Sequence, residues 1–298
     1  MVERMEVYTA VRAHGLKARL LTKQDYEALL KGARKLWDFP DYSQVSEKDP
    51  IEMKLEKVYA VYVRRMNLLA KSTPTLFDFI RALLDRLEVE NIKIQIRYIL
   101  GFQRPVIYYP YGHFLGPAKL KSLHSESSLW RELSNSPFKL PEDFSFRTQL
   151  PAEREVLVDM LYLRYLSDEI RGLKMTRDAR SALEDLLSLE YTLRYVLWEK
   201  ALGGSTTKEM LKAVELPLQL LEGFLTELRA RSVSDVIVHG MREVLRKARA
   251  EALKYPLGAV YIYIFNILAL VEAQNIEKIL LGQELGLAEE VIDRHLYL

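Results

Sequence analysis

The stretch LFDFIRALLDRLEVENIKIQIRYIL, residues 76–100, contains the pattern that decides the fold of this chain. Its apolar residues recur three or four positions apart with charged residues between them, which indicates an amphipathic helix. The same pattern covers five further stretches, at residues 47–70, 151–170, 178–202, 236–255 and 260–281. Strand-like alternation is confined to residues 106–109, between two prolines. The sequence therefore predicts an all-α protein.

Part of this stretch recurs near the end of the chain. LEVENI at residues 87–92 matches VEAQNI at residues 271–276, and the apolar residues upstream match at the same spacing. A weaker third copy, LEYTL at residues 189–193, lies between them. Self-similarity of this kind is typical of a repeat architecture. We predict three related helical repeats over residues 1–102, 103–204 and 205–298, the second beginning with an irregular, proline-rich segment.

The copies share two polar positions, which we take as the framework of the repeat. The glutamates are Glu88, Glu190 and Glu272, and the asparagines are Asn91 and Asn275, with leucine in the third copy. A short amide inside an apolar helix can pin that helix to a neighbouring one by bonding its backbone. We therefore predict a structural role for the asparagines. Repeated carboxylates are typical of a solvated helix face, so we expect Glu88 and Glu272 to be exposed and not catalytic.

Composition excludes several classes of function. The 298 residues include 43 Lys and Arg against 41 Asp and Glu, a formal net charge of +2, which does not indicate a nucleic-acid binder. The absence of cysteine excludes disulfides, cysteine-ligated metals and thiol nucleophiles. The five histidines lack metal-ligand spacing, and no phosphate-binding loop, GxSxG elbow or DDxxD pair occurs. We expect no cofactor, no metal and no catalytic residue.

Two segments of the sequence indicate whether the chain enters a membrane. The first residues carry Glu3 and Glu6 where a secretory signal requires an apolar segment. The most apolar stretch, residues 256–271, is shorter than the roughly 20 residues that a membrane span requires and contains Asn266. We predict a buried core helix here and only peripheral contact with a membrane.

One helix carries a basic edge formed by Arg242, Arg246 and Arg249, spaced four and then three residues apart. Glu243 and Glu251 on the same helix suggest a solvated face that pairs with itself. The other interpretation is a contact site for an acidic protein or for anionic lipid head groups. The residues alone therefore leave a helical scaffold or adaptor and, as a further alternative, an all-α enzyme with a small-substrate pocket.

Segments along almost the whole chain resemble the C subunit of the central stalk of archaeal A-type (V/A-type) ATP synthases, whose family includes the d subunit of V-type ATPases. The segments that carry the resemblance are YTAVRA at 8–13, RLLT at 19–22, DY at 25–26, LL at 29–30, PYG at 110–112, EVLVDMLY at 155–162, EYTLRYVLWEK at 190–200, EAQNI at 272–276, GQ at 282–283, GL at 286–287 and EVI at 290–292. Their order and spacing together are similar to those of the family. The chain departs from the family pattern at Leu193, Glu277 and Gln283.

The resemblance implies three helical units that form a funnel with pseudo-threefold symmetry. Such a protein lies on the cytoplasmic side of the cell membrane as a peripheral protein. It binds the proteolipid ring and receives the rotating shaft, which is made of the D and F subunits. The implied function is non-catalytic: a rotor component that transmits torque between ion transport and ATP synthesis or hydrolysis. The resemblance also implies no nucleic-acid partner and no homo-oligomer. The alternative is an unrelated all-α protein-binding scaffold or adaptor.

Overall fold

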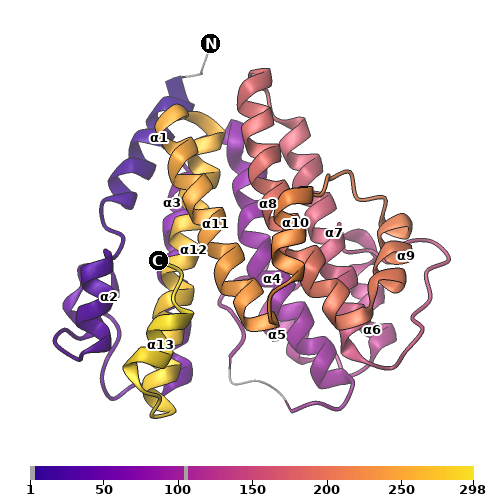
Figure 1. Ribbon diagram of the computed structural model, residues 1–298, viewed down its shortest axis with the longest axis horizontal. Helices are drawn as coiled ribbons and strands as arrows, with labels where there is room; N and C mark the ends of the chain where they lie inside the picture. The colour runs from indigo at the N-terminus through magenta and orange to yellow at the C-terminus, as the bar shows by residue number, and fades with distance from the viewer. Residues whose placement is uncertain (1–3, 104–106) are drawn as a thin grey trace. The chain divides into compact units, whose positions relative to one another are not determined.

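The computed structural model describes residues 4–103 and 107–298, and within these ranges every regular element is helical (Figure 1). The prediction of an all-α protein is confirmed. The α-helices are α1 Arg4–Lys17, α2 Lys23–Leu30, α3 Ile51–Ala70, α4 Phe77–Ile99, α5 Pro117–Lys121, α6 Glu126–Glu132, α7 Pro151–Gly172, α8 Arg177–Leu202, α9 Gly204–Val214, α10 Glu222–Arg229, α11 Val233–Lys254, α12 Gly258–Glu284 and α13 Glu289–His295. Short 3-10 turns lie at Leu36–Asp38, Pro40–Tyr42, Pro74–Leu76 and Leu133–Asn135.

The six stretches with helical periodicity form the six longest helices, α3, α4, α7, α8, α11 and α12. In α3 the buried side chains include Val58, Tyr62, Met66 and Leu69, which lie three or four residues apart and so share one face. The irregular, proline-rich segment after α4 contains the short helices α5 and α6. The possible strand at 106–109 lies partly outside the described residues, and its described part forms no strand.

Contacts divide the chain into two compact units. The first unit comprises Met1–Ile80 together with Met241–Leu298, and the second comprises Arg81–Gly240. These divisions fall inside α4 and α11, away from the predicted repeat boundaries. The three-repeat organisation thus remains a prediction.

In the first unit, α12 packs against α1 and α3, so the two ends of the chain lie side by side (Figure 1). Its buried side chains include Tyr261, Ile264 and Phe265, each at most 1% exposed. The apolar surface removed from water on this face is the main source of stability for the unit. This arrangement brings α12 into contact with the link between α1 and α2, where the polar groups described below converge.

Helix α12 is the single described helix that is long and apolar enough to cross a membrane by length and composition. In the structure, 89% of its most apolar 18-residue stretch is buried inside the protein. The predicted buried helix is therefore confirmed for this stretch. The observed helix, at 27 residues, is longer than the predicted apolar stretch.

In the second unit, α8 packs against α7, α9 and α10. Gly203 separates α8 from α9 with a φ of +84°, a backbone conformation that glycine adopts without steric cost. From the sequence TTKE, Thr206 would cap α9. That expectation is wrong, because α9 begins at Gly204 and the Thr207 hydroxyl donates instead to the carbonyl of Gly203.

Candidate functional site

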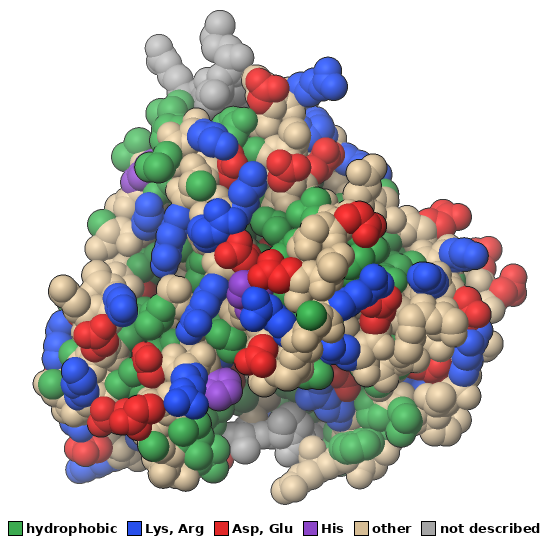
Figure 2. Space-filling view, viewed as in Figure 1, with side chains coloured by type: hydrophobic (Ala, Val, Ile, Leu, Met, Phe, Trp, Pro, Cys, Tyr) green, Lys and Arg blue, Asp and Glu red, His purple; other side chains and the backbone are tan. Residues whose placement is uncertain are grey.

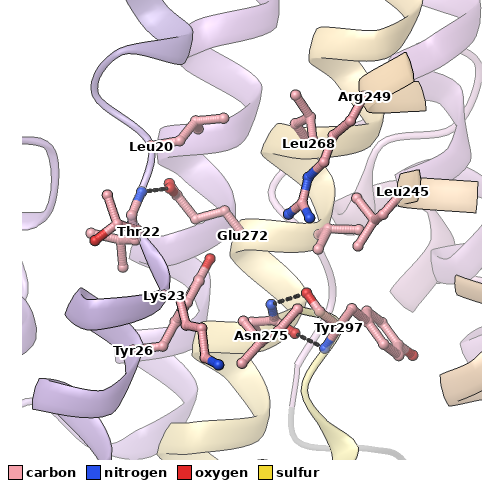
Figure 3. A pocket seen from close by; sticks show the side chains of 13 residues that line it. Leu20, Thr22, Lys23, Tyr26, Leu245, Arg249, Leu268, Glu272, Asn275 and Tyr297 are labelled. Carbon is pink, nitrogen blue, oxygen red and sulfur yellow. Dashed lines mark hydrogen bonds between the residues drawn. The ribbon is translucent and has the colours of Figure 1, made fainter. Parts of the chain in front are cut away.

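Asn91 and Asn275, the two repeated asparagines, make the same contact in the two units. The side chain of Asn91 accepts from the N–H of Tyr109 at 2.7 Å and donates to its carbonyl at 2.9 Å. The side chain of Asn275 accepts from the N–H of Tyr297 at 2.9 Å and donates to its carbonyl at 3.0 Å (Figure 3). Each amide thus pairs with both backbone groups of one tyrosine, as a neighbouring strand would.

The expectation that these amides bond backbone agrees with these contacts, but the partner differs from the prediction. Neither Tyr109 nor Tyr297 belongs to a helix. The backbone N–H and C=O of an extended segment have no partner of their own, so a buried segment of this kind requires side-chain partners. The asparagines therefore hold irregular chain against a helix, and do not pin one helix to another.

The prediction that Glu88 and Glu272 face solvent is wrong. Glu88 is 0% exposed, Glu272 is 1% exposed and Glu190 is 5% exposed. The carboxylate of Glu88 accepts from the N–H groups of His113 at 2.7 Å, Phe114 at 3.0 Å and Leu115. Burial raises the pKa of Glu88, although the three N–H donors act in the opposite direction. The charge is buried because it supplies acceptors to backbone that lies outside any helix.

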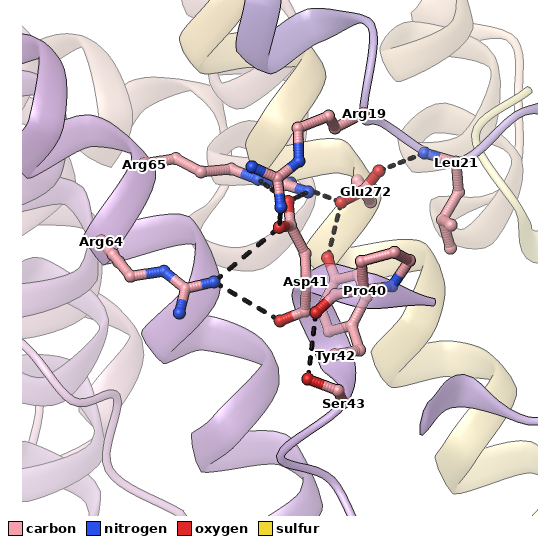
Figure 4. Close-up of polar contacts among 9 residues, drawn as sticks. All are labelled: Arg19, Leu21, Pro40, Asp41, Tyr42, Ser43, Arg64, Arg65 and Glu272. Carbon is pink, nitrogen blue, oxygen red and sulfur yellow. Dashed lines mark hydrogen bonds and ion pairs between the residues drawn. The ribbon is translucent and has the colours of Figure 1, made fainter. Parts of the chain in front are cut away.

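Glu272 holds a different set of groups (Figure 4). Its carboxylate accepts from the N–H of Leu21, the hydroxyl of Tyr42 and the guanidinium of Arg65, each at 2.5 Å. Burial is the main reason why the pKa of Tyr42 is raised, so its hydroxyl remains a donor to the carboxylate. Through these contacts, one carboxylate connects α12 to α3 and to the link between α1 and α2.

Arg65 is the centre of an ion network that the sequence pattern did not predict. It is 2% exposed and bridges Glu272 to Asp41, whose carboxylate lies 2.6 Å from its Nη2. Asp41 also pairs with Arg19 and lies 4.0 Å from Arg64. Figure 4 shows these three arginines converging on Asp41. One feature of the sequence could have predicted the network. Arg65 lies on the apolar face of α3, and a charged side chain is rarely buried there without a partner of opposite charge.

A second buried ion network lies in the other unit, and its central carboxylate belongs to the segment EVLVDMLY at residues 155–162. Asp159 on α7 lies 3.1 Å from Lys93 on α4 and 2.8 Å from Arg194 on α8. The indole N–H of Trp198 donates to the same carboxylate at 3.4 Å. Burial opposes ionisation of Asp159, but the two cations outweigh it and lower its pKa.

The third copy of the repeat keeps the glutamate but uses other groups around it. Glu190 pairs with Arg86 at 2.7 Å. Leu193, at the asparagine position, packs so closely on Gly240 that a Cβ atom there would lie 2.4 Å from its Cδ1. The neighbouring Thr192 hydroxyl accepts instead from the N–H of Leu221, at 3.1 Å. In this copy, the hydroxyl of Thr192, one residue before Leu193, binds a backbone N–H in place of an asparagine side chain.

The three arginines of the basic edge on α11 are exposed but have different surroundings. Arg242 donates to the carbonyls of Leu296 at 3.0 Å and Arg294 at 3.5 Å. Arg246 pairs with Glu243 at 2.7 Å. On the face seen in Figure 2, Lys and Arg side chains gather over α1 and α11. The self-paired interpretation thus describes Arg246, whereas Arg242 holds the C-terminal segment.

Arg249 lines a cavity of about 220 Å³ in the first unit. The cavity lies between the α1–α2 link, α11 and α12, and Glu272 and Asn275 form part of its wall (Figure 3). Apolar side chains of Leu20, Leu245 and Leu268 complete it. A smaller cavity of about 180 Å³ borders Arg19 and Asp41. Across residues 4–103 and 107–298, no group of three or more His, Asp or Glu side chains is placed to hold a metal ion.

Lys278 on α12 provides a prediction about pH. Its amine donates to the carbonyl of His295 at 2.8 Å, and burial lowers its pKa to about 7. A free lysine titrates near 10.4, so between about pH 7 and pH 10 the unfolded chain binds a proton that the folded chain lacks. The contribution of Lys278 to the free energy of unfolding therefore rises with pH across this window.

We expect the stability of Lys278→Met relative to the wild type to be greatest near pH 6 and to decline toward pH 10. Thermal unfolding of both proteins at several pH values measures this difference. Lys31→Met, at an exposed position, is the control and should show no such trend. A difference between Lys278→Met and the wild type that is the same at every pH would contradict the prediction.

The sequence matches no protein-family model and no curated protein.

Proposed function

We propose that this chain is a central-stalk rotor component of an A/V-type ATP synthase or ATPase, in the family of the archaeal C and V-type d subunits. The observation that carries the proposal is the repeated contact of Asn91 and Asn275, each of which bonds both backbone groups of one tyrosine. Equivalent anchors at equivalent positions support an internally repeated architecture. In an enzyme, we would expect the asymmetry of a single active site.

The lengths of the helices support the same proposal. The long helices occur as three consecutive pairs, α3 with α4, α7 with α8, and α11 with α12. Their lengths are 20 and 23, 22 and 26, and 22 and 27 residues. The second helix of each pair carries a buried glutamate, Glu88, Glu190 or Glu272. We propose that each repeat contains one such consecutive pair and that three repeats form the funnel that the family resemblance implies.

A rotor component of this kind has a mechanical function. It receives the shaft made of the D and F subunits, binds the proteolipid ring on the cytoplasmic side of the membrane, and transmits torque between ion transport and ATP synthesis or hydrolysis. Close-packed interiors transmit strain because they are nearly incompressible. The buried anchors of Glu88, Asn91, Glu272 and Asn275 would add stiffness by fixing irregular chain to long helices. The proposed component is not catalytic.

The test is to co-express the chain with the D and F shaft subunits from the same genome and to measure the mass of the purified product by light scattering. We expect a stoichiometric ternary complex. Binding to the proteolipid ring in lipid nanodiscs is measured separately, with empty nanodiscs as the control. If the folded chain binds neither shaft nor ring, the proposal is wrong, and a helical adaptor with soluble partners becomes the better hypothesis.

A further inference from the structure

The structure separates Arg249 from the other two arginines of the basic edge. Arg242 is engaged by backbone carbonyls and Arg246 by Glu243. Among the described residues, none pairs with the guanidinium of Arg249, which Figure 3 shows directed from α11 into the 220 Å³ cavity. A guanidinium has five N–H donors and no acceptor, so it recognises an anion, best of all a planar carboxylate.

The other polar groups that line this cavity favour the same class of ligand. Lys23, at the start of α2, also lines it, and within the described part of the chain no acidic group pairs with its amine. Glu272 is the acidic side chain in the wall, but its oxygens are engaged by Leu21, Tyr42 and Arg65. The amide of Asn275 is engaged by the backbone of Tyr297. Thr22, Tyr26 and Leu298 complete the polar and terminal part of the lining, and the Thr22 hydroxyl donates to Asp25 at 2.7 Å. Arg249 and Lys23 are therefore the charged side chains of the wall that no described acidic side chain pairs.

Size and wall chemistry restrict the anion further. About 220 Å³ is below the range of roughly 300–1,000 Å³ that is usual for sites of drug-sized ligands and cofactors, which argues against a nucleotide. Leu20, Leu245, Leu268 and Val271 provide apolar walls that suit the methylenes of a short chain. A strongly hydrated phosphate gains nothing from such walls. An aspartate or glutamate side chain satisfies both the cations and the apolar walls.

We propose that this cavity accepts a carboxylate side chain from a protein partner, which Arg249 and Lys23 bind while the leucines cover its aliphatic part. The inference rests on the proposed function for the identity of the partner, a protein of the shaft or the ring. It assigns to Arg249 a role that Arg242 and Arg246 do not share. The apolar walls lower the local dielectric and strengthen the ion pair relative to one in open water.

The first experiment tests the isolated chain with glutarate, a soluble carboxylate of suitable length. Binding is followed by the NMR signals of the arginine Nε–H groups, with inorganic phosphate as the competing probe. We expect glutarate affinity to fall about tenfold or more in Arg249→Gln, because a bidentate charge-assisted contact is lost. Arg246→Gln, one turn away on the same helix, is the matched control and should bind as the wild type does. Unchanged affinity in Arg249→Gln, no binding to the wild type, or tighter binding of phosphate than of glutarate would overturn the inference.

The second experiment identifies the source of the carboxylate in the assembled complex. A water-soluble carbodiimide activates a carboxylate, the Lys23 amine attacks it to form an amide, and the reagent leaves as its urea after taking up the elements of water. We expect mass spectrometry to find Lys23 joined to an aspartate or glutamate of a shaft or ring protein. Lys23→Arg keeps the charge but should abolish this cross-link.

The outcomes separate the two proposals. If the complex forms without a Lys23 cross-link, and Arg249→Gln assembles as the wild type does, the inference is overturned while the proposed function stands. If the wild type binds neither shaft nor ring, the proposed function fails, and with it the assignment of the partner. The glutarate experiment then decides independently whether the cavity selects carboxylates.

Discussion

Replacing Glu272 by alanine is expected to lower the free energy of unfolding by about 3–5 kcal/mol, the range for removing one partner of a buried ion pair. The substitution leaves Asp41 as the one carboxylate partner of the buried Arg65 guanidinium among the described residues. It also removes the acceptor of the Tyr42 hydroxyl and the Leu21 N–H. Urea denaturation followed by circular dichroism measures the loss. Glu272→Gln retains one acceptor oxygen and should lose less stability than the alanine variant.

Glu284 provides the matched control for Glu272, because it lies on the same helix but is exposed. Glu284→Ala should change the free energy of unfolding by less than about 0.5 kcal/mol, as surface substitutions usually do. If Glu272→Ala proved as stable as Glu284→Ala, the buried network around Arg65 would not exist in solution. The role assigned to Glu272, a buried carboxylate that joins helices, would then be wrong.

Replacing Asp159 by alanine is expected to have a comparably large effect in the other unit, again about 3–5 kcal/mol. Lys93 and Arg194 would both lose their shared counter-ion, and Lys93, 8% exposed, would keep its ion pair with Glu90 at 2.7 Å. Because Lys93 is buried, little water can solvate its ammonium group after the loss of Asp159. Thermal unfolding should show a clear decrease in melting temperature.

Asp168, exposed on the same helix α7, is the control for Asp159. Asp168→Ala should unfold close to the wild type. The lowered pKa of Asp159 adds a second signature, since its stabilising effect is lost as the pH falls through that pKa. The difference between the wild type and Asp159→Ala should therefore shrink in acid. A difference that stays constant down to strongly acidic pH would contradict the assignment of charge to this network.

Both variants also connect stability to the proposed function. Glu272 and Asp159 lie in segments that carry the family resemblance, and in the structure each joins helices through buried charge. A protein that transmits torque requires such rigid joints between its helices. If the variants fold at low temperature, their affinity for the shaft should fall less than their stability, because neither carboxylate is exposed.

The sequence alone determined the class and the long helices of this protein. The spacing of apolar residues defined α3, α4, α7, α8, α11 and α12 within a few residues, because a helix exposes one face to the core at every third or fourth position. The repeated asparagines were correctly expected to bond backbone, because a buried amide needs partners of that kind. The repeat was visible at Asn91 and Asn275 because the same contact with a tyrosine backbone requires the same side chain.

The tertiary structure alone decided where the charged side chains lie. Periodicity assigns Glu88 and Glu272 to a position on a helix, but it contains no information about the extended segments, distant in sequence, that cover that position. Whether a carboxylate is solvated or buried depends on those segments and on the donors that they bring. For the same reason, only the structure distinguished Arg249, with its cavity and no acidic partner among the described residues, from Arg246, which lies three residues earlier and is paired with Glu243.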